Sequence, residues 1–206
     1  VWYNPNLKST YFMIPGIVAV LLTMITSLIT SMGIVREREI GTLEQLMVTP
    51  IRSYQLIAGK TIPFAILGLV EITFALAVGT LWFQIPLLGN IGILFLFCFV
   101  FLLTTLGLGL FVSTAATTQQ QAMFIAWFIN VFALIMSGFL FPLENMPKML
   151  QYISYLNPLR YFITVLRELF LKGSGINYLY KEGIIMLLFG LVIFTLSALR
   201  FRKRIS

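Results

Sequence analysis

Five long apolar segments follow one another along the chain. Each is close to the roughly 20 apolar residues that a helix needs to cross about 30 Å of hydrocarbon. They are continuously apolar, without the alternation of barrel strands, and only helices satisfy their own backbone groups in lipid. The pattern predicts an all-α, polytopic membrane helix bundle with five transmembrane helices. These run from about 12–35, 61–83, 91–112, 122–141 and 183–199, the last with an alternative start near Ile176.

The composition narrows the possible chemistry. Apolar residues make up 59% of the chain and charged residues 10%, against roughly 45–50% and about 25% in soluble domains. His and Asp are absent, and Cys98 is the single cysteine. These absences exclude a Ser-His-Asp triad, an HExxH zinc site and a disulfide within the chain. We therefore expect a transport chain that is not an enzyme, with no metal or cofactor of its own.

Lys and Arg near the ends of the apolar segments predict the orientation. The tail after residue 199 is basic, and basic residues also lie between the first two segments, so both regions are expected in the cytoplasm. Five spans then place the N-terminus outside, with residues 1–11 as an external linker and 142–182 as a long external segment. An external N-terminus without a signal peptide predicts a further span upstream of Val1. The net charge of +7 is explained by this topology, so we expect no nucleic-acid partner.

The densest charge cluster follows the first apolar segment, in the sequence REREIGTLEQLMVTP of residues 36–50. Within the predicted cytoplasmic loop 36–56, Thr42 and Gln45 form a capping box that favours a short helix, and Pro50 ends it. The helical period aligns an apolar stripe, Ile40, Leu43 and Met47, beside Glu37, Gly41 and Glu44. Two interpretations remain open: a helix on the lipid headgroups, or a docking surface for a cytosolic protein. The carboxylates favour the second, because acids are repelled by anionic lipid.

One acidic residue lies inside an apolar segment. Glu71 is placed near the bilayer centre, where an exposed acid costs roughly 2.5–3.5 kcal/mol on insertion scales. It is either a carboxylate of the pathway or gate, or a protonated group that hydrogen-bonds another helix. Asn130, in the middle of the fourth segment, is a candidate partner. If Glu71 were an ion site, the chain would be an ion-coupled carrier or channel, which is the alternative function.

Two further segments have structural patterns. Thr105, Gly109 and Ser113 are four residues apart and predict a face for close helix packing. The external segment 142–182 has amphipathic stretches interrupted by Pro158, which predicts two short helices that dip into the outer leaflet. Arg160 then either approaches the permeation path or an acidic lipid, or serves as an interfacial anchor.

Two sequence blocks resemble a known family. The first is REREIGTLEQLMVTP, followed by Gly59-Lys60 before the second apolar segment. The second is SGFLFPLENMP of residues 137–147, followed by LNPLR of residues 156–160. Their order and their spacing from the apolar segments are similar to those of permease subunits of type-2 ATP-binding-cassette (ABC) exporters. This resemblance covers nearly the whole chain.

The resemblance implies a mechanism and partners. The loop of the first block would carry a coupling helix that docks on a separate cytosolic ATPase, through Glu37, Glu39, Gly41, Thr42, Glu44 and Leu46. The second block would be an external re-entrant hairpin containing Pro142, Pro147, Pro158 and Arg160. ATP and magnesium would be bound by the partner, because this chain has no GxxxxGK[ST] loop. A second permease copy or paralogue, a bacterial inner membrane, and a first span with an external domain upstream are also implied.

Overall fold

The computed structural model describes residues 9–42, 53–141 and 143–205. Within these ranges the regular structure is helical, and no strand occurs. The predicted all-α membrane bundle is confirmed. In chain order the helices are α1 (Ser9–Ile40), α3 (Ser53–Ala77), the π-helical turn η1 (Val78–Trp82), α4 (Ile91–Ala115), α5 (Gln119–Ile135), the 3₁₀ turn η2 (Leu143–Asn145), α6 (Lys148–Ser154), α7 (Pro158–Lys172) and α8 (Ile176–Ile205).

A helix occupies each of the five predicted positions, but its ends differ from the prediction. Among the described residues, four helices are long and apolar enough to cross a membrane: Met13–Ile40, Gln55–Trp82, Ile91–Ala115 and Ile176–Phe201. The fifth, α5, has 17 residues, or about 26 Å at 1.5 Å per residue. It stops at Ile135 rather than Phe141, because Gly138 adopts a left-handed conformation with φ 75° that turns the chain out of the helix. The last helix begins at Ile176, the alternative start.

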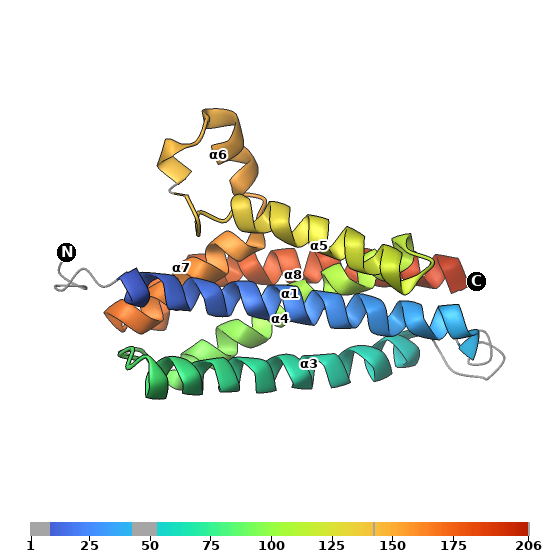
Figure 1. Cartoon of the computed structure of the whole chain (residues 1–206), viewed down its shortest axis with the longest axis horizontal. Coiled ribbons are helices and arrows are strands. Elements are labelled where there is room, and N and C mark those ends of the chain that lie inside the picture. Colours follow the sequence, from blue (N-terminus) through green and yellow to red (C-terminus); the bar gives the residue numbers. More distant parts are fainter. Residues whose placement is uncertain (1–8, 43–52, 142, 206) are drawn as a thin grey trace.

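The long helices run side by side, with α1 between α3 and α5 in the view of Figure 1. Behind α1 lies α4, which is apolar on all sides and packs most extensively against α8 and α1. Two glycines of α4 allow this close packing. A Cβ atom on Gly107 would lie 2.9 Å from the amide nitrogen of Phe194 in α8, and one on Gly109 would lie 2.6 Å from Thr30 Cβ in α1. The predicted packing face is therefore confirmed at Gly109.

The hairpin and the bundle share one hydrophobic core. As predicted, two short helices, α6 and α7, follow α5 and are separated just before Pro158. α7 buries one face against α1 and α8, and its Phe162 ring stacks on Phe101 of α4 with centroids 4.1 Å apart. The chain between η1 and α4 is also attached to α7, since the Gly89 amide donates to the Leu169 carbonyl oxygen at 2.9 Å. By contrast, α6 projects from the side of the bundle (Figure 1).

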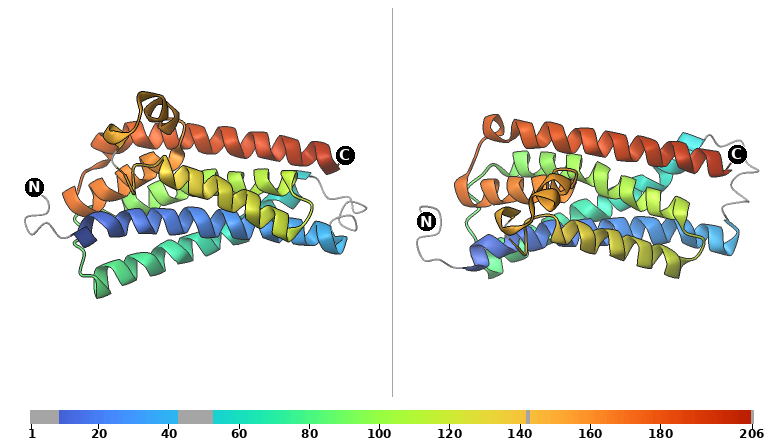
Figure 2. Two further views of the ribbon diagram at one scale, coloured as in Figure 1. Left: turned by 45° about the horizontal axis from the view of Figure 1, so that its top comes forward. Right: turned by 90° about the horizontal axis from the view of Figure 1, so that it is seen from above.

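The molecule has two distinct ends. Figure 2 shows the N-terminal end of α1 and the start of α8 at one end, with α7 beside them. At the opposite end are the last turn of α1, the first turn of α3 and the C-terminal part of α8. The segments for which the sequence predicts a cytoplasmic location therefore gather at one end. The hairpin, which the sequence predicts to be external, lies toward the other end.

Candidate coupling face and intramembrane polar groups

The charged sequence that follows the first apolar segment is helical. Arg36 to Ile40 form the last turns of α1 instead of the start of a loop, which corrects the predicted boundary at residue 36. Hydropathy identifies only the apolar part of a helix. A helix can continue through charged residues once the chain has left the apolar layer. Gly41 ends α1 with φ 83°, and its amide donates to the Arg38 carbonyl oxygen at 3.1 Å.

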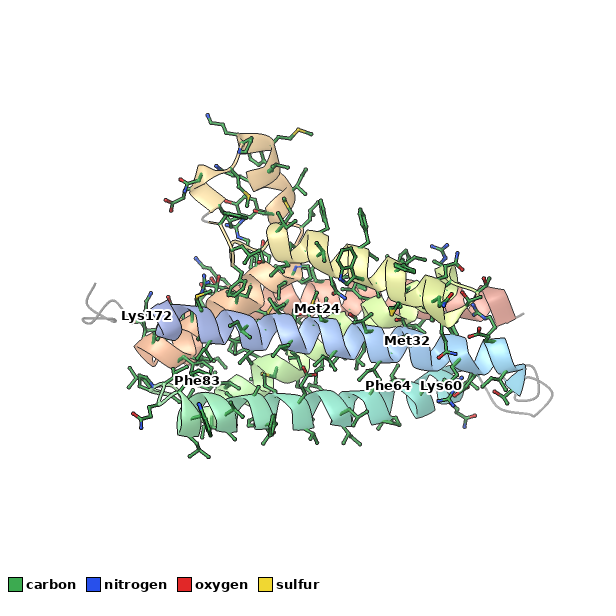
Figure 3. All side chains as sticks on the ribbon, viewed as in Figure 1. Met24, Met32, Lys60, Phe64, Phe83 and Lys172 are labelled. Carbon is green, nitrogen blue, oxygen red and sulfur yellow. The ribbon has the colours of Figure 1, made fainter. Side chains whose placement is uncertain are left out.

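Glu37 connects α1 to α3. Its carboxylate forms an ion pair with the ammonium group of Lys60. The Lys60 side chain is only 11% exposed, compared with 38% for Glu37. The Thr42 hydroxyl donates to the backbone carbonyl of Glu37 at 3.1 Å. Figure 3 labels Lys60 on α3, on the side that faces the end of α1. This ion pair therefore holds the two helices together where they leave the apolar layer.

Arg38 and Glu39 connect the end of α1 to α4 and α5. Arg38 Nη1 donates to the carbonyl oxygens of Ser113 and Ala116, each at 2.9 Å, and so satisfies carbonyls at the C-terminal end of α4. Glu39 Oε2 accepts from the backbone amide of Gln119 at 3.3 Å and from its side-chain nitrogen at 2.9 Å. An acid at the first residue of α5 is favourable, because the N-terminus of a helix is positive.

We call Glu37, Arg38, Glu39 and Lys60 the α1-end network. Two of the residues predicted for an ATPase interface, Glu37 and Glu39, belong to it and bind within the chain. Gly41 is open, with nothing within 4 Å of the position of a Cβ atom. The contacts of Arg38 and Lys60 were not predicted from the sequence, where these residues mark the cytoplasmic side and belong to the first family block. Glu44 and Leu46 lie outside the described residues.

Asn130 and Glu71, which the sequence singles out within the apolar segments, have different surroundings. Asn130 is buried, and its Nδ2 donates to Ser27 Oγ of α1 at 2.8 Å. Glu71 of α3 has no hydrogen-bond partner among the described residues, although both of its carboxylate oxygens are buried. The structure therefore does not bring Glu71 and Asn130 together as predicted. Asn130 instead connects α5 to α1.

Glu71 lines a cavity of about 340 Å³ between α1 and α3. A second cavity of about 340 Å³ lies between α4, α5 and the hairpin. Its wall is largely apolar, but the buried hydroxyl of Thr104 contributes to it and has no hydrogen-bond partner among the described residues. Each of these cavities is thus largely apolar and holds a polar side chain that has no hydrogen-bond partner among the described residues.

The residues predicted for the hairpin have structural roles. Pro147 is the N-cap of α6, and Pro158 is in the first turn of α7, where its fixed φ suits a helix start. Asn157 fixes the corner between them: its side-chain oxygen accepts from the Leu159 amide at 3.1 Å and its Nδ2 donates to the Ala133 carbonyl at 2.6 Å. Pro142 lies outside the described residues.

Arg160 stays within the hairpin. Its Nη1 donates to Ser154 Oγ at 2.6 Å, and its guanidinium group lies 4.2 Å from the centre of the Tyr155 ring. These contacts attach α7 to the end of α6. Arg160 therefore stabilises the hairpin, and its approach to a permeation path or to an acidic lipid stays a prediction.

Long apolar helices packed side by side are the architecture of a polytopic membrane protein. The chain matches the ABC-2 type transporter family over residues 1–171. It belongs to this family, and the resemblance drawn from the two sequence blocks is confirmed.

Several bacterial permeases are similar to the chain over most of its length. It is 36% identical to the probable multidrug ABC transporter permease YbhR of Escherichia coli over 88% of the chain and 49% of that protein. It is 35% identical to the probable multidrug ABC transporter permease YbhS of the same organism over 100% of the chain and 55% of that protein. The inner membrane transport permease YhhJ is 29% identical over 99% of the chain and 55% of that protein. The chain thus spans about half the length of these relatives.

Proposed function

We propose that this chain is part of the transmembrane permease of an ATP-driven ABC exporter. A separate cytosolic ATPase would bind ATP and magnesium, and two permease copies or paralogues would together form the pathway in a bacterial inner membrane. The permease would have its C-terminus in the cytoplasm. Family membership supports the class of transporter, and the names of the relatives support transport across the inner membrane.

The α1-end network is the observation that supports the coupling mechanism best. It joins the end of α1 to the first turns of α3, to the last carbonyls of α4 and to the start of α5. A force applied by an ATPase at residues 41–52 would therefore reach four helices at once. Movement of the end of α1 would then move all four helices together, because the ion pair and the hydrogen bonds of the network hold their ends at fixed distances. Glu37 and Glu39 would then transmit the movement, while Gly41, Thr42, Glu44 and Leu46 would face the ATPase.

A charge reversal tests this mechanism. We expect Glu44→Lys to reduce copurification of the ATPase and to uncouple ATP hydrolysis from transport, because a carboxylate that faces basic residues would become repulsive. Membrane insertion should be unchanged. Copurification, ATPase activity and substrate efflux should be measured on the same preparations. Glu144→Lys, on the hairpin at the other end, is the matched control and should behave like wild type. Normal efflux in Glu44→Lys would contradict the proposed role.

The unpaired carboxylate of Glu71 favours a second candidate function, an ion-coupled carrier or channel. Such a protein needs no ATPase, and its cytoplasmic segment would be incidental. Transport that persists without ATP and without any copurifying ATPase, but is lost in Glu71→Gln, would favour this alternative.

A further inference from the structure

The carboxylate of Glu71 lies in an unusual environment for an acid. Glu71 is in the middle of α3, and its side chain lines the cavity of about 340 Å³ between α1 and α3, which we call the Glu71 cavity. Both carboxylate oxygens are buried and have no hydrogen-bond partner among the described residues. An unpaired acid at this depth is costly. A ligand with a positive charge would remove that cost.

The described residues supply no counter-ion to the cavity. Besides Glu71, the polar side chain in its described lining is Thr26, whose hydroxyl already donates to the Leu22 carbonyl of its own helix. Lys60 precedes Glu71 by eleven residues, which places it on the same face of α3 three turns away. Its ammonium group pairs with Glu37. The described wall of the cavity therefore has a carboxylate and no base.

The rest of the wall is apolar and partly aromatic. Phe64 and Phe74 flank Glu71 along α3, and Ile25 and Ile29 face it from α1. Phe64 is labelled in Figure 3, where its side chain points from α3 toward α1; its ring lies against Gly33, because a Cβ atom there would be 2.5 Å from the ring. Aromatic faces attract cations, and this attraction is strongest where water is excluded. The wall thus suits an organic cation better than a hydrated ion.

The cavity is also open on its outer side. Val70 and Phe74, which form part of its wall, are 59% and 71% exposed, and they lie on α3 at the edge of the bundle (Figure 1). Among the described residues, no other helix covers these two side chains. The cavity therefore opens at the surface of the described bundle, where a ligand can enter without passing between its packed helices.

We propose that the Glu71 cavity is a binding site for a lipophilic monovalent cation, held by Glu71 and the surrounding apolar side chains and entered from the lipid. The wall favours an organic cation over a small inorganic one, because an inorganic cation needs several oxygen ligands and the described wall offers one carboxylate. The proposal goes beyond the proposed function, since binding requires neither ATP nor an ATPase.

Equilibrium binding of tetraphenylphosphonium tests the proposal. The full-length protein is reconstituted in phosphatidylcholine nanodiscs, which carry no anionic lipid that would collect the probe. We expect saturable binding to wild type and a loss of roughly tenfold or more in affinity for Glu71→Gln, because the charge attraction is removed while the shape is kept. Glu71→Asp should retain binding. Glu144→Gln removes an acid from the hairpin and should bind like wild type.

A second pair of variants separates the cavity from the charge. Leu67→Trp places a large ring in the cavity wall while Glu71 is unchanged, so we expect weaker binding. Leu191→Trp on α8 is the matched control, since Leu67 and Leu191 are both 51% exposed, and it should have no effect. Tetraphenylborate has the same shape with a negative charge and should not bind in a Glu71-dependent way.

Three results would overturn the proposal. These are the absence of saturable binding to wild type, equal binding by Glu71→Gln, and disulfide-linked dimers formed by Val70→Cys, which would show that a second copy covers the cavity. Because the assay contains no ATPase, failure of the proposed exporter mechanism would leave these binding results unchanged. Conversely, normal ATP-driven efflux combined with absent cation binding would reject only this site.

Discussion

Hydroxyl and amide side chains in the bundle satisfy their hydrogen bonds in different ways. Thr23 and Thr30 donate to carbonyls four residues earlier in α1, at 2.7 and 2.6 Å, so each is satisfied within its own helix. A side-chain amide has more donors and acceptors to satisfy than a hydroxyl, and Asn130 donates to Ser27 on another helix. Glu71 has neither kind of partner among the described residues. Asn130 is therefore a packing residue, whereas Glu71, like Thr104, has no hydrogen-bond partner among the described residues.

A double-mutant cycle between Asn130→Ala and Ser27→Ala should measure this interhelical bond. We expect a coupling of about 0.6 kcal/mol, and at most about 1.7 kcal/mol, because hydrogen bonds in membrane proteins are worth little more than those in water. The free energy of unfolding in mixed micelles is the measurement. Asn130→Ala combined with Ser197→Ala should be additive, since Ser197 bonds to Ile193 within α8 at 2.6 Å. Additivity in the Ser27 cycle would mean that the contact does not stabilise the fold.

The lengths of the helices depend on more than hydropathy. The apolar pattern located all five, because desolvation of the backbone requires helices wherever the chain meets lipid. It missed their true ends: α1 continues to Ile40 and α8 to Ile205, whereas α5 stops at Ile135. Charged extensions are stabilised by contacts from other helices, such as Arg38 with the end of α4. A single apolar segment contains no information about these contacts.

The close contact between α1 and α4 gives a prediction at this scale. Gly109→Ala should destabilise the fold by about 1–3 kcal/mol, because the new Cβ would lie 2.6 Å from Thr30 Cβ and 2.9 Å from the Ser27 carbonyl oxygen. Gly59→Ala in α3 is the matched control, since nothing lies within 4 Å of that position, and it should be neutral or stabilising by up to about 1 kcal/mol. Thermal unfolding in detergent would compare the two. Similar unfolding temperatures would show that α1 and α4 separate easily.

In the whole molecule, the hairpin and the charged network occupy opposite ends. The C-terminal part of α8 and the end of α1 lie at the same end of the bundle (Figure 2), as expected if Lys and Arg mark the cytoplasmic side. α7 fills the bundle between α1 and α8 toward the other end. The fold thus separates the segment proposed to receive a force from the hairpin proposed to face outward.

Cysteine labelling tests the orientation. We expect Ile40→Cys to react with a membrane-impermeant maleimide only in inside-out vesicles, and Met149→Cys on α6 only in right-side-out vesicles. Both positions are suited to labelling, because Ile40 is 63% and Met149 74% exposed. Wild type should remain unlabelled, since Cys98 is buried. Labelling of both variants from the same side would contradict the proposed topology.

The all-helical membrane class, the place of each helix and the family follow from the amino-acid sequence alone, because they depend on local apolar length and on contiguous motifs. The sequence also identifies Glu71 and Asn130 as the exceptional polar groups. Only the tertiary structure decided their partners: Ser27 for Asn130, none among the described residues for Glu71, and Lys60 for Glu37. Helical periodicity places a side chain on a face of its own helix, but the neighbouring helix that it meets depends on how the whole bundle packs.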